Sequence, residues 1–207
     1  MKWSATIDKY LTLKDFDNYY NQFSNPKTLK KYKIWFADEM RFGLMTNEKR
    51  SWNKVGERTR LPNQMEYANR YLYSAVSPID GESVHIIGFS DANAETTNLF
   101  LDEINNQFPD TINIIIWDNA PFHKSKILHS KKNISILTLP SYGQELNPTE
   151  RFFGEMRKST ANKIYKNINT IEKLIHEEVL IWINDKNRTK GLIFWDYMKK
   201  QLNIIDS

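Results

Sequence analysis

At residues 112–118 the chain reads INIIIWD, a short apolar run that ends in an acidic residue. Apolar runs of this length are typical of a central strand whose two faces are both covered in an α/β protein. A second run of the same kind, KIWFAD, occupies residues 33–38 and also ends in aspartate. The two runs therefore predict two buried strands, one ending at Asp118 and the other at Asp38.

Weaker patterns on both sides of these runs predict the remaining elements. Residues 71–76 and 84–88 flank a segment with Pro and Asp-Gly, which supplies the turn of a β-hairpin. Residues 41–60 are expected to form a loop or an irregular hairpin. The other expected elements are a strand at 134–139 and helices at about 93–108, 147–163, 170–184 and 191–202. This order predicts an α/β fold, a mixed β-sheet flanked by helices.

Apolar residues recur at helical spacing in three of the expected helices. In helix 93–108, which Asn93 or Asp91 can cap, they are Leu99, Phe100 and Ile104. One face of helix 147–163 carries Phe153, Met156, Thr160 and Ile164. The stripe of helix 170–184 consists of Ile171, Leu174, Ile175, Val179 and Trp182. These faces are expected to pack on the core.

The composition excludes several classes of protein. A chain of 207 residues can bury a core without cross-links, and the absence of cysteine rules out disulfides and thiolate metal sites. The apolar runs are too short to cross a bilayer, and no signal peptide is evident. We therefore expect a cytoplasmic protein in which an arm or linker remnant, residues 1–31 with a short helix near 14–23, precedes one domain at residues 32–207. The net charge of +4 permits a polyanionic partner.

Three acidic residues fall where side chains can meet at one edge of the expected sheet. Asp38 and Asp118 end the two buried strands, and Glu150 lies in the first turn of the helix that follows the last strand. Ligand sites in open α/β sheets form outside the strand ends, and three carboxylates there would repel one another unless a cation neutralised them. Mg²⁺ prefers such oxygen ligands, and two ions about 3.5–4 Å apart can promote phosphoryl transfer.

Each acid also has a purely structural interpretation. Aspartates at strand ends commonly form turns. Asn147 as N-cap, Pro148 at the first helical position and Glu150 at the third would form a capping box. From spacing alone, the capping interpretation is favoured over the catalytic one. Glu39 adjoins Asp38, but side chains alternate along a strand, so only one of this pair can face a site.

Three sequence blocks resemble one enzyme family. They are FADE at 36–39, WDNAPFH at 117–123 and LPSYGQELNPTE at 139–150. Together they resemble the motifs of the Asp-Asp-Glu (DDE) endonuclease domain of mariner-like bacterial insertion-sequence transposases, over residues 32 to at least 183. The resemblance implies a ribonuclease H-like fold in which the catalytic residues that bind two Mg²⁺ ions, or Mn²⁺ in their place, are Asp38, Asp118 and Glu150. It also implies cleavage of DNA at transposon ends and strand transfer of the freed 3′-hydroxyl into target DNA.

The third block departs from the family's usual pattern at four positions, Ser141, Gly143, Gln144 and Thr149. Two of these replace prolines, and a loop with fewer prolines has more conformational entropy to lose on folding. The resemblance therefore predicts a looser loop before Glu150, while the identity of the acid is unchanged.

Basic residues close to the acids are expected to hold DNA phosphates. They are Lys124, Lys126, Arg151, Arg157 and Lys158. By resemblance, the chain acts as a homodimer on double-stranded DNA. Too few residues precede the first expected strand for the helix-turn-helix modules of full-length relatives, which implies a separately encoded DNA-binding partner. The alternatives are a DNA-binding remnant without catalytic activity, and a different ribonuclease H-like nuclease that cuts RNA–DNA hybrids or junctions.

Overall fold

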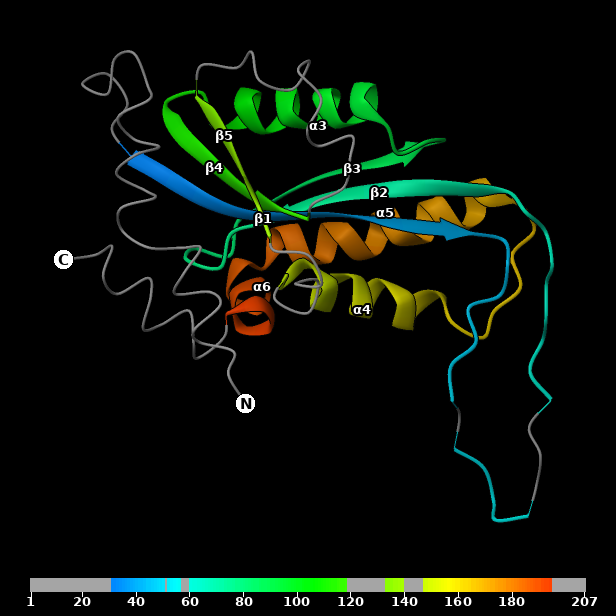
Figure 1. Cartoon of the computed structure of the whole chain (residues 1–207). Coiled ribbons are helices and arrows are strands. Elements are labelled where there is room, and N and C mark those ends of the chain that lie inside the picture. The colour runs from blue at the N-terminus through cyan, green and yellow to red at the C-terminus, as the bar shows by residue number, and fades with distance from the viewer. Residues whose placement is uncertain (1–30, 51, 57–59, 119–132, 140–146, 195–207) are drawn as a thin grey trace.

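The computed structural model describes residues 31–50, 52–56, 60–118, 133–139 and 147–194. These residues form a five-stranded sheet in the order β3-β2-β1-β4-β5, with helices on both faces (Figure 1). The elements are β1 (Lys31–Gly43), β2 (Asn69–Val76), β3 (Ser83–Phe89), α3 (Ala94–Gln107), β4 (Thr111–Trp117), β5 (Ile134–Thr138), α4 (Thr149–Thr160), α5 (Ile168–Asn184) and α6 (Lys186–Ile193). The helix expected near 14–23 and all of the expected arm except Lys31 lie outside the described residues.

The sheet is mixed, as the sequence predicts. β2 and β3 form the expected antiparallel hairpin, β1 pairs with β2 antiparallel and with β4 parallel, and β4 pairs with β5 parallel. The middle strand is β1, however, and the run at 112–118, which forms most of β4, lies between β1 and β5. The prediction of a central strand is therefore right about burial and wrong about position. An apolar run indicates that both faces are covered, but many interior places in a sheet meet that condition.

Strand β1 continues well beyond Asp38, where the sequence predicts its end. It remains paired with β2 up to Gly43, whereas its pairing with β4 stops at Phe36. Met40 and Phe42 are buried at alternate positions after Asp38. The prediction that Asp38 ends a strand is therefore wrong, because β2 continues to satisfy the backbone of β1. Asp38 lies within β1, two residues past the last pair with β4.

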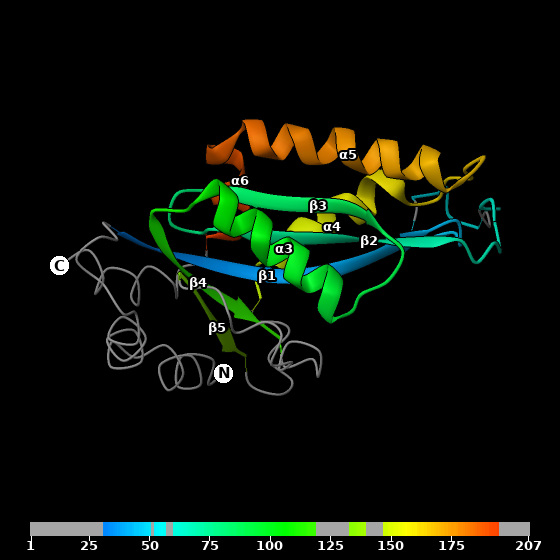
Figure 2. The same cartoon turned by 90° about the horizontal axis from the view of Figure 1, so that it is seen from above.

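Two cores lie on opposite faces of the sheet. Helices α4, α5 and α6 cover one face and α3 covers the other (Figure 1), and the view from above shows α3 lying over the sheet (Figure 2). The side chains of β1 alternate between these cores. Ile34, Phe36 and Met40 join the core that includes α4, α5 and α6. Trp35 and Ala37 join the core that includes α3, so the even-numbered positions of β1 face α4.

Helix α3 begins where the sequence predicts. Asn93 caps it by accepting hydrogen bonds from Glu95 N and Thr96 N. The buried face consists of Thr97, Phe100, Leu101 and Ile104. Leu99 is 50% exposed. Its assignment to the apolar face is therefore wrong, because the spacing i, i+3, i+4, i+7 that begins at Thr97 leaves Leu99 off the buried stripe.

Helix α4 is shorter than the sequence predicts. It ends at Thr160, so that Ile164 lies beyond the helix and is 57% exposed. Asn162 has a φ of 56°, and a residue in this left-handed region commonly ends a helix. The prediction that Ile164 shares the apolar face of Phe153 and Met156 is therefore wrong, while those two residues are fully buried.

Helix α5 confirms most of its predicted stripe, whereas α6 lies earlier in the chain than predicted. Leu174 is half-buried, and the fully buried members of the stripe are Ile171, Ile175, Val179 and Trp182. Asp185 caps α6 by accepting a hydrogen bond from Arg188 N, and the helix ends at Ile193. The predicted start at residue 191 is wrong because Asp185 already provides an N-cap. Residues 195–202 lie outside the described chain.

The described residues between 44 and 68 form an extension that projects beyond the ends of β1 and β2 (Figure 1). Gln64 ties its base to the rest of the fold, because its Nε2 donates to Tyr165 O and its Oε1 accepts from Tyr165 N, both at 2.9 Å. The irregular connection expected at 41–60 thus begins only after Gly43. Within the described ranges, no helix combines the length and the apolar character that crossing a bilayer requires.

Candidate active site

Asp38 and Asp118 lie at equivalent places relative to two neighbouring parallel strands, Asp38 within β1 and Asp118 directly after the end of β4. Phe36 of β1 pairs with Ile116 of β4, and each aspartate lies two residues further along its own strand direction. Phe36 and Ile116 belong to the core that includes α4, and alternation gives the aspartates the same side of the sheet. Alternation thus predicts that both carboxylates face α4, and the charge of Asp118 acts on the pKa of Asp38.

Two side chains fasten the start of α4 directly to β1. Asn147 Nδ2 donates to Ala37 O at 2.8 Å, and Thr149 Oγ1 donates to Phe36 O at 2.8 Å. Both side chains are buried, so these hydrogen bonds form where water cannot replace them. Glu150 follows Thr149 immediately, and the two contacts therefore hold it beside Asp38.

The sequence does not predict this docking, and it predicts a capping box that the structure does not contain. α4 begins at Thr149, and Pro148 takes the N-cap position. Asn147 Oδ1 accepts from Thr149 N at 3.1 Å, while its amide group is committed to β1. The Glu150 carboxylate is turned toward Arg157, whose Nη1 donates to it at 3.0 Å. The only hint of the docking in the sequence is that polar Asn147 and Thr149 flank a proline just before an apolar helix face.

The surroundings of Asp38 disfavour its charged form. Its pKa is raised to about 8, mainly by burial and in addition by the charges of Glu39, Glu150 and Asp118, while a hydrogen bond from Glu39 N opposes the shift. That bond, from Glu39 N to Asp38 Oδ1, is 2.9 Å long, and Asn147 Nδ2 lies 3.5 Å from Asp38 Oδ2. The influence of Asp118 and Glu150 on Asp38 means that the three acids share one neighbourhood.

Only one acid of the Asp38–Glu39 pair faces this neighbourhood, as strand alternation predicts. Glu39 occupies an odd-numbered position of β1, on the side of the sheet covered by α3. The pKa of Tyr73, which belongs to the α3 core, is raised by burial and also by the charge of Glu39. Glu39 is therefore assigned to the opposite face.

The three acids are neighbours, but their carboxylates do not converge on a single ion position. Within the described ranges, no three acidic or imidazole side chains converge closely enough to hold a single ion. The Glu150 side chain is 42% exposed and contacts Arg157, which is 41% exposed. The arrangement thus leaves Glu150 turned along α4 rather than toward the two aspartates.

The basic residues expected to hold DNA are only partly described. Lys124 and Lys126 lie outside the described residues. Arg151 Nη1 donates to Leu192 O of α6 at 3.2 Å, Lys158 pairs with Glu155, and Arg157 pairs with Glu150. Their role in DNA binding stays a prediction, and each of the three described residues has a partner within the chain.

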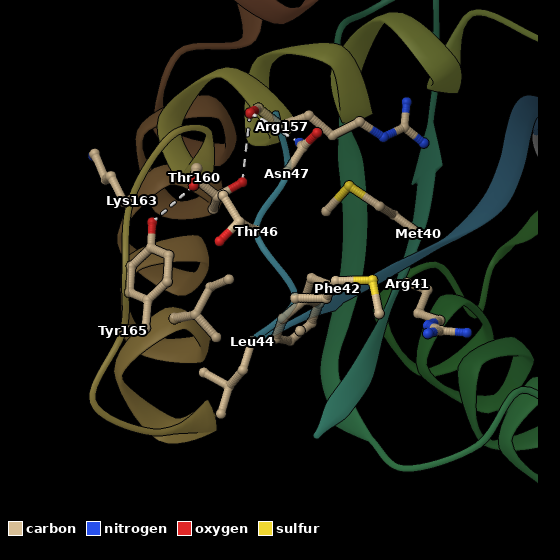
Figure 3. A pocket seen from close by; sticks show the side chains of 13 residues that line it. Met40, Arg41, Phe42, Leu44, Thr46, Asn47, Arg157, Thr160, Lys163 and Tyr165 are labelled. Atoms are coloured by element: carbon tan, nitrogen blue, oxygen red, sulfur yellow. Dashed lines mark hydrogen bonds between the residues drawn. The ribbon is translucent and has the colours of Figure 1, made fainter. Parts of the chain in front are cut away.

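A cavity of about 240 Å³ opens beside the C-terminal half of α4, between that helix and the end of β1 (Figure 3). Its apolar lining includes Met40, Phe42 and Tyr165, and its polar lining includes Arg157 and Thr160. Arg157 therefore touches both the cavity and Glu150. The sequence does not predict the cavity, because its lining comes from segments more than a hundred residues apart.

Comparison with solved structures relates the fold to Mos1 transposase. The chain is similar to the Mos1 transposase paired-end complex with left transposon end, with a TM-score of 0.61 and 15% identity over 93% of this chain and 59% of that chain. It is similar to the Mos1 strand transfer complex, with a TM-score of 0.60 and 14% identity over 97% of this chain and 59% of that chain. For the catalytic domain of Mos1 mariner transposase the TM-score is 0.54, with 12% identity over 96% of this chain and 93% of that chain.

These likenesses confirm the ribonuclease H-like fold. The chain spans less than two thirds of the length of the Mos1 chains in the two complexes. No curated protein sequence matches it. The sequence model of the DDE superfamily endonucleases matches residues 33–175, which make up most of the chain and include Asp38, Asp118 and Glu150. The chain therefore belongs to the DDE superfamily endonuclease family.

Proposed function

We propose that this chain is the catalytic domain of a DNA transposase, with Asp38, Asp118 and Glu150 as its catalytic residues. The observation that carries the proposal is the docking of α4 on β1. The hydrogen bonds from Asn147 and Thr149 to β1 keep Glu150 near two aspartates that each lie two residues beyond the last pair of the adjacent parallel strands β1 and β4.

The donor set fits a pair of divalent ions. A carboxyl group whose pKa lies at about 8 because of burial and acidic neighbours is stabilised in its charged form by a nearby cation. Asp38, Asp118 and Glu150 would hold the ions, and oxygen ligands suit Mg²⁺ and Mn²⁺. When bound, the ions supply Lewis-acid stabilisation of the attacking and leaving oxygens. Solved paired-end complexes of mariner Mos1 include one with Mn and one with Mg, which supports this choice.

The proposed reaction has two displacements at phosphorus. In the first, the oxygen of water bonds to the phosphorus at the transposon end and the P–O3′ bond breaks, which leaves a 3′-hydroxyl and a 5′-phosphate. In the second, the oxygen of that hydroxyl bonds to a phosphorus of target DNA, and the displaced target O3′ takes up the proton. The contribution of the chain is to orient the scissile phosphate and to hold its carboxylates in place.

The DNA would lie along the basic side of α4. Arg151, Arg157 and Lys158, together with Lys124 and Lys126, would contact phosphates and give affinity that falls with salt. The structural neighbours include complexes with transposon ends, which supports DNA as the substrate. We further propose that residues 32–207 form the catalytic domain behind an arm at 1–31, that two copies act together, and that a separately encoded helix-turn-helix protein recognises the transposon ends.

Nicking of supercoiled plasmid in Mg²⁺ or Mn²⁺ tests the proposal. The unmodified chain should nick the plasmid, Asp118→Asn should abolish nicking, and Asp110→Asn, at an exposed turn, should leave it unchanged. A second assay should show a 3′-hydroxyl oligonucleotide joined to duplex target. Equal nicking by the unmodified chain and Asp118→Asn would contradict the assigned residues.

Two other results would favour the alternative functions. DNA retention without nicking in either metal would point to a binding remnant. Cleavage of an RNA–DNA hybrid or a junction, with no joining to target, would point to a different ribonuclease H-like nuclease.

A further inference from the structure

Arg157 and Glu150 form an ion pair across two turns of α4. They lie seven positions apart in the sequence, which brings their side chains to the same side of the helix. Arg157 Nη1 lies 3.0 Å from Glu150 Oε2, and Figure 3 shows the Arg157 side chain extending away from Thr160. The guanidinium also lies 5.9 Å from the centre of the Phe153 ring, so aromatic contact supports the same conformation.

This pair opposes assembly of the three acids. A carboxylate that is neutralised by a guanidinium is a weaker ligand, and the pair turns Glu150 along the helix. The described residues contain no group of three acidic or imidazole side chains that could hold one ion, although Glu150 is close enough to raise the pKa of Asp38. For Glu150 to join the two aspartates around an ion, Arg157 has to release it.

A DNA phosphate is a suitable competing partner for Arg157. The planar guanidinium binds phosphate through two parallel hydrogen bonds, and it binds carboxylate in the same way. At 41% exposure the Arg157 side chain is accessible to a ligand. The neighbouring cation Lys158 pairs with Glu155 instead, so its release would not free a proposed catalytic residue.

We propose that Arg157 is a positioning residue that couples DNA binding to divalent-ion binding. Without DNA it keeps the Glu150 carboxylate turned along α4 and not toward Asp38 and Asp118. When a phosphate of bound DNA takes the guanidinium, Glu150 is free to complete the ion site. This inference rests on the proposed function, and linkage requires that the ion strengthen DNA binding by the same factor by which DNA strengthens ion binding.

Mn²⁺ binding by the full chain, measured by electron paramagnetic resonance with and without a short DNA duplex, tests the coupling. In the unmodified chain, DNA should increase Mn²⁺ affinity by up to about fivefold, since an exposed ion pair is broken in the process. Arg157→Gln should bind Mn²⁺ more tightly than the unmodified chain without DNA, and DNA should then add nothing. Arg157→Lys, which keeps a charge near Glu150, should restore part of the coupling.

Lys173→Gln is the matched control, because it removes one positive charge from an exposed ion pair on α5, that with Glu177, and leaves Glu150 paired with Arg157. It should keep the full effect of DNA on Mn²⁺ affinity. Loss of the coupling in Lys173→Gln, or full coupling in Arg157→Gln, would overturn the inference. Failure of the proposed function has a different signature, namely Mn²⁺ binding that is unaffected by Asp118→Asn whether DNA is present or not.

Discussion

Asp38 carries an electrostatic penalty that an ion or a proton can relieve. Its pKa is raised to about 8 by burial and acidic neighbours, against an ordinary value of 3.8. The folded state therefore binds this proton more tightly than the unfolded state, and the contribution of Asp38 to stability falls as the pH rises from about 4 to about 8. A carboxylate so placed is more typical of a ligand site than of a strand position that serves only structure.

Asp38→Asn should stabilise the metal-free chain at pH 8, because it removes the buried charge. A tenfold change in a protonation equilibrium is worth about 1.4 kcal/mol, so we expect a gain in the free energy of unfolding on the order of 2–5 kcal/mol. The gain should shrink as the pH falls toward 4. Urea denaturation at several pH values checks this, with Asp110→Asn as the exposed control. A constant difference across the pH range would contradict it.

His85 affects the pH dependence of stability in the opposite direction to Asp38, because it destabilises the fold at acid pH. It is half-buried, stacks on Phe152 at 4.7 Å between ring centres, and lies 2.9 Å from Ser74 Oγ through Nδ1. Burial lowers its pKa from 6.5 to about 3, so the unfolded state binds the proton more tightly. Stability from this residue is therefore complete above about pH 6.5 and is lost as the pH falls toward 3.

His85→Phe should remove that acid sensitivity while keeping an aromatic ring against Phe152. The unpaired Ser74 hydroxyl should cost about 1–3 kcal/mol at neutral pH. The free energy of unfolding of the variant should then decline less between pH 6.5 and pH 4 than that of the unmodified chain. Parallel pH profiles for the two proteins would show that His85 does not titrate as inferred.

At the scale of elements, the position of α4 on β1 determines the site. Thr149→Val keeps the shape of the side chain but leaves the Phe36 carbonyl without its buried donor. We expect a loss of about 1–3 kcal/mol in the free energy of unfolding. Plasmid nicking should fall by on the order of tenfold or more, because small displacements of catalytic groups reduce rates strongly.

Thr160→Val is the matched control for Thr149→Val, since both residues are buried threonines of α4. The Thr160 hydroxyl donates to Met156 O at 3.1 Å, inside the helix, and makes no link to β1. This variant should keep its nicking activity. Equal loss of nicking activity in both variants would mean that any substitution of a buried threonine of α4 reduces activity. The docking of α4 on β1 would then have no special role.

Most of the helices and strands could be predicted from the sequence, but the residues at which they begin and end could not. Apolar runs and helical stripes are local patterns, and they identified β1, β4 and α5. The ends depend on distant partners: β2 extends β1 past Asp38, and Asn162 stops α4 before Ile164. The same holds for the site, because resemblance supplied the three acids while the docking of α4 is a tertiary contact that no local pattern encodes.

At the scale of the whole molecule, the end of β1 that lies away from Asp38 is fastened by ion pairs and a tight turn. Lys33 contacts Asp80 and Glu82 of the turn between β2 and β3, and Lys186 of α6 donates to Glu82 at 2.8 Å. Gly81 allows this approach, since a Cβ there would lie 2.0 Å from Lys186 O. The turn therefore joins the sheet to α6 at a distance from the proposed catalytic residues.

Gly81→Ala should destabilise the fold more than Gly56→Ala, although both glycines have positive φ values, +73° and +91°. The left-handed backbone should cost about 1–2 kcal/mol in either variant. Collision with Lys186 should add about 1–3 kcal/mol at Gly81 alone, because nothing lies within 4 Å of a Cβ at Gly56. Thermal unfolding checks the order of the two variants. Below its melting temperature, Gly81→Ala should nick plasmid as fast as the unmodified chain; slower nicking by folded protein would mean that the two ends of β1 are coupled.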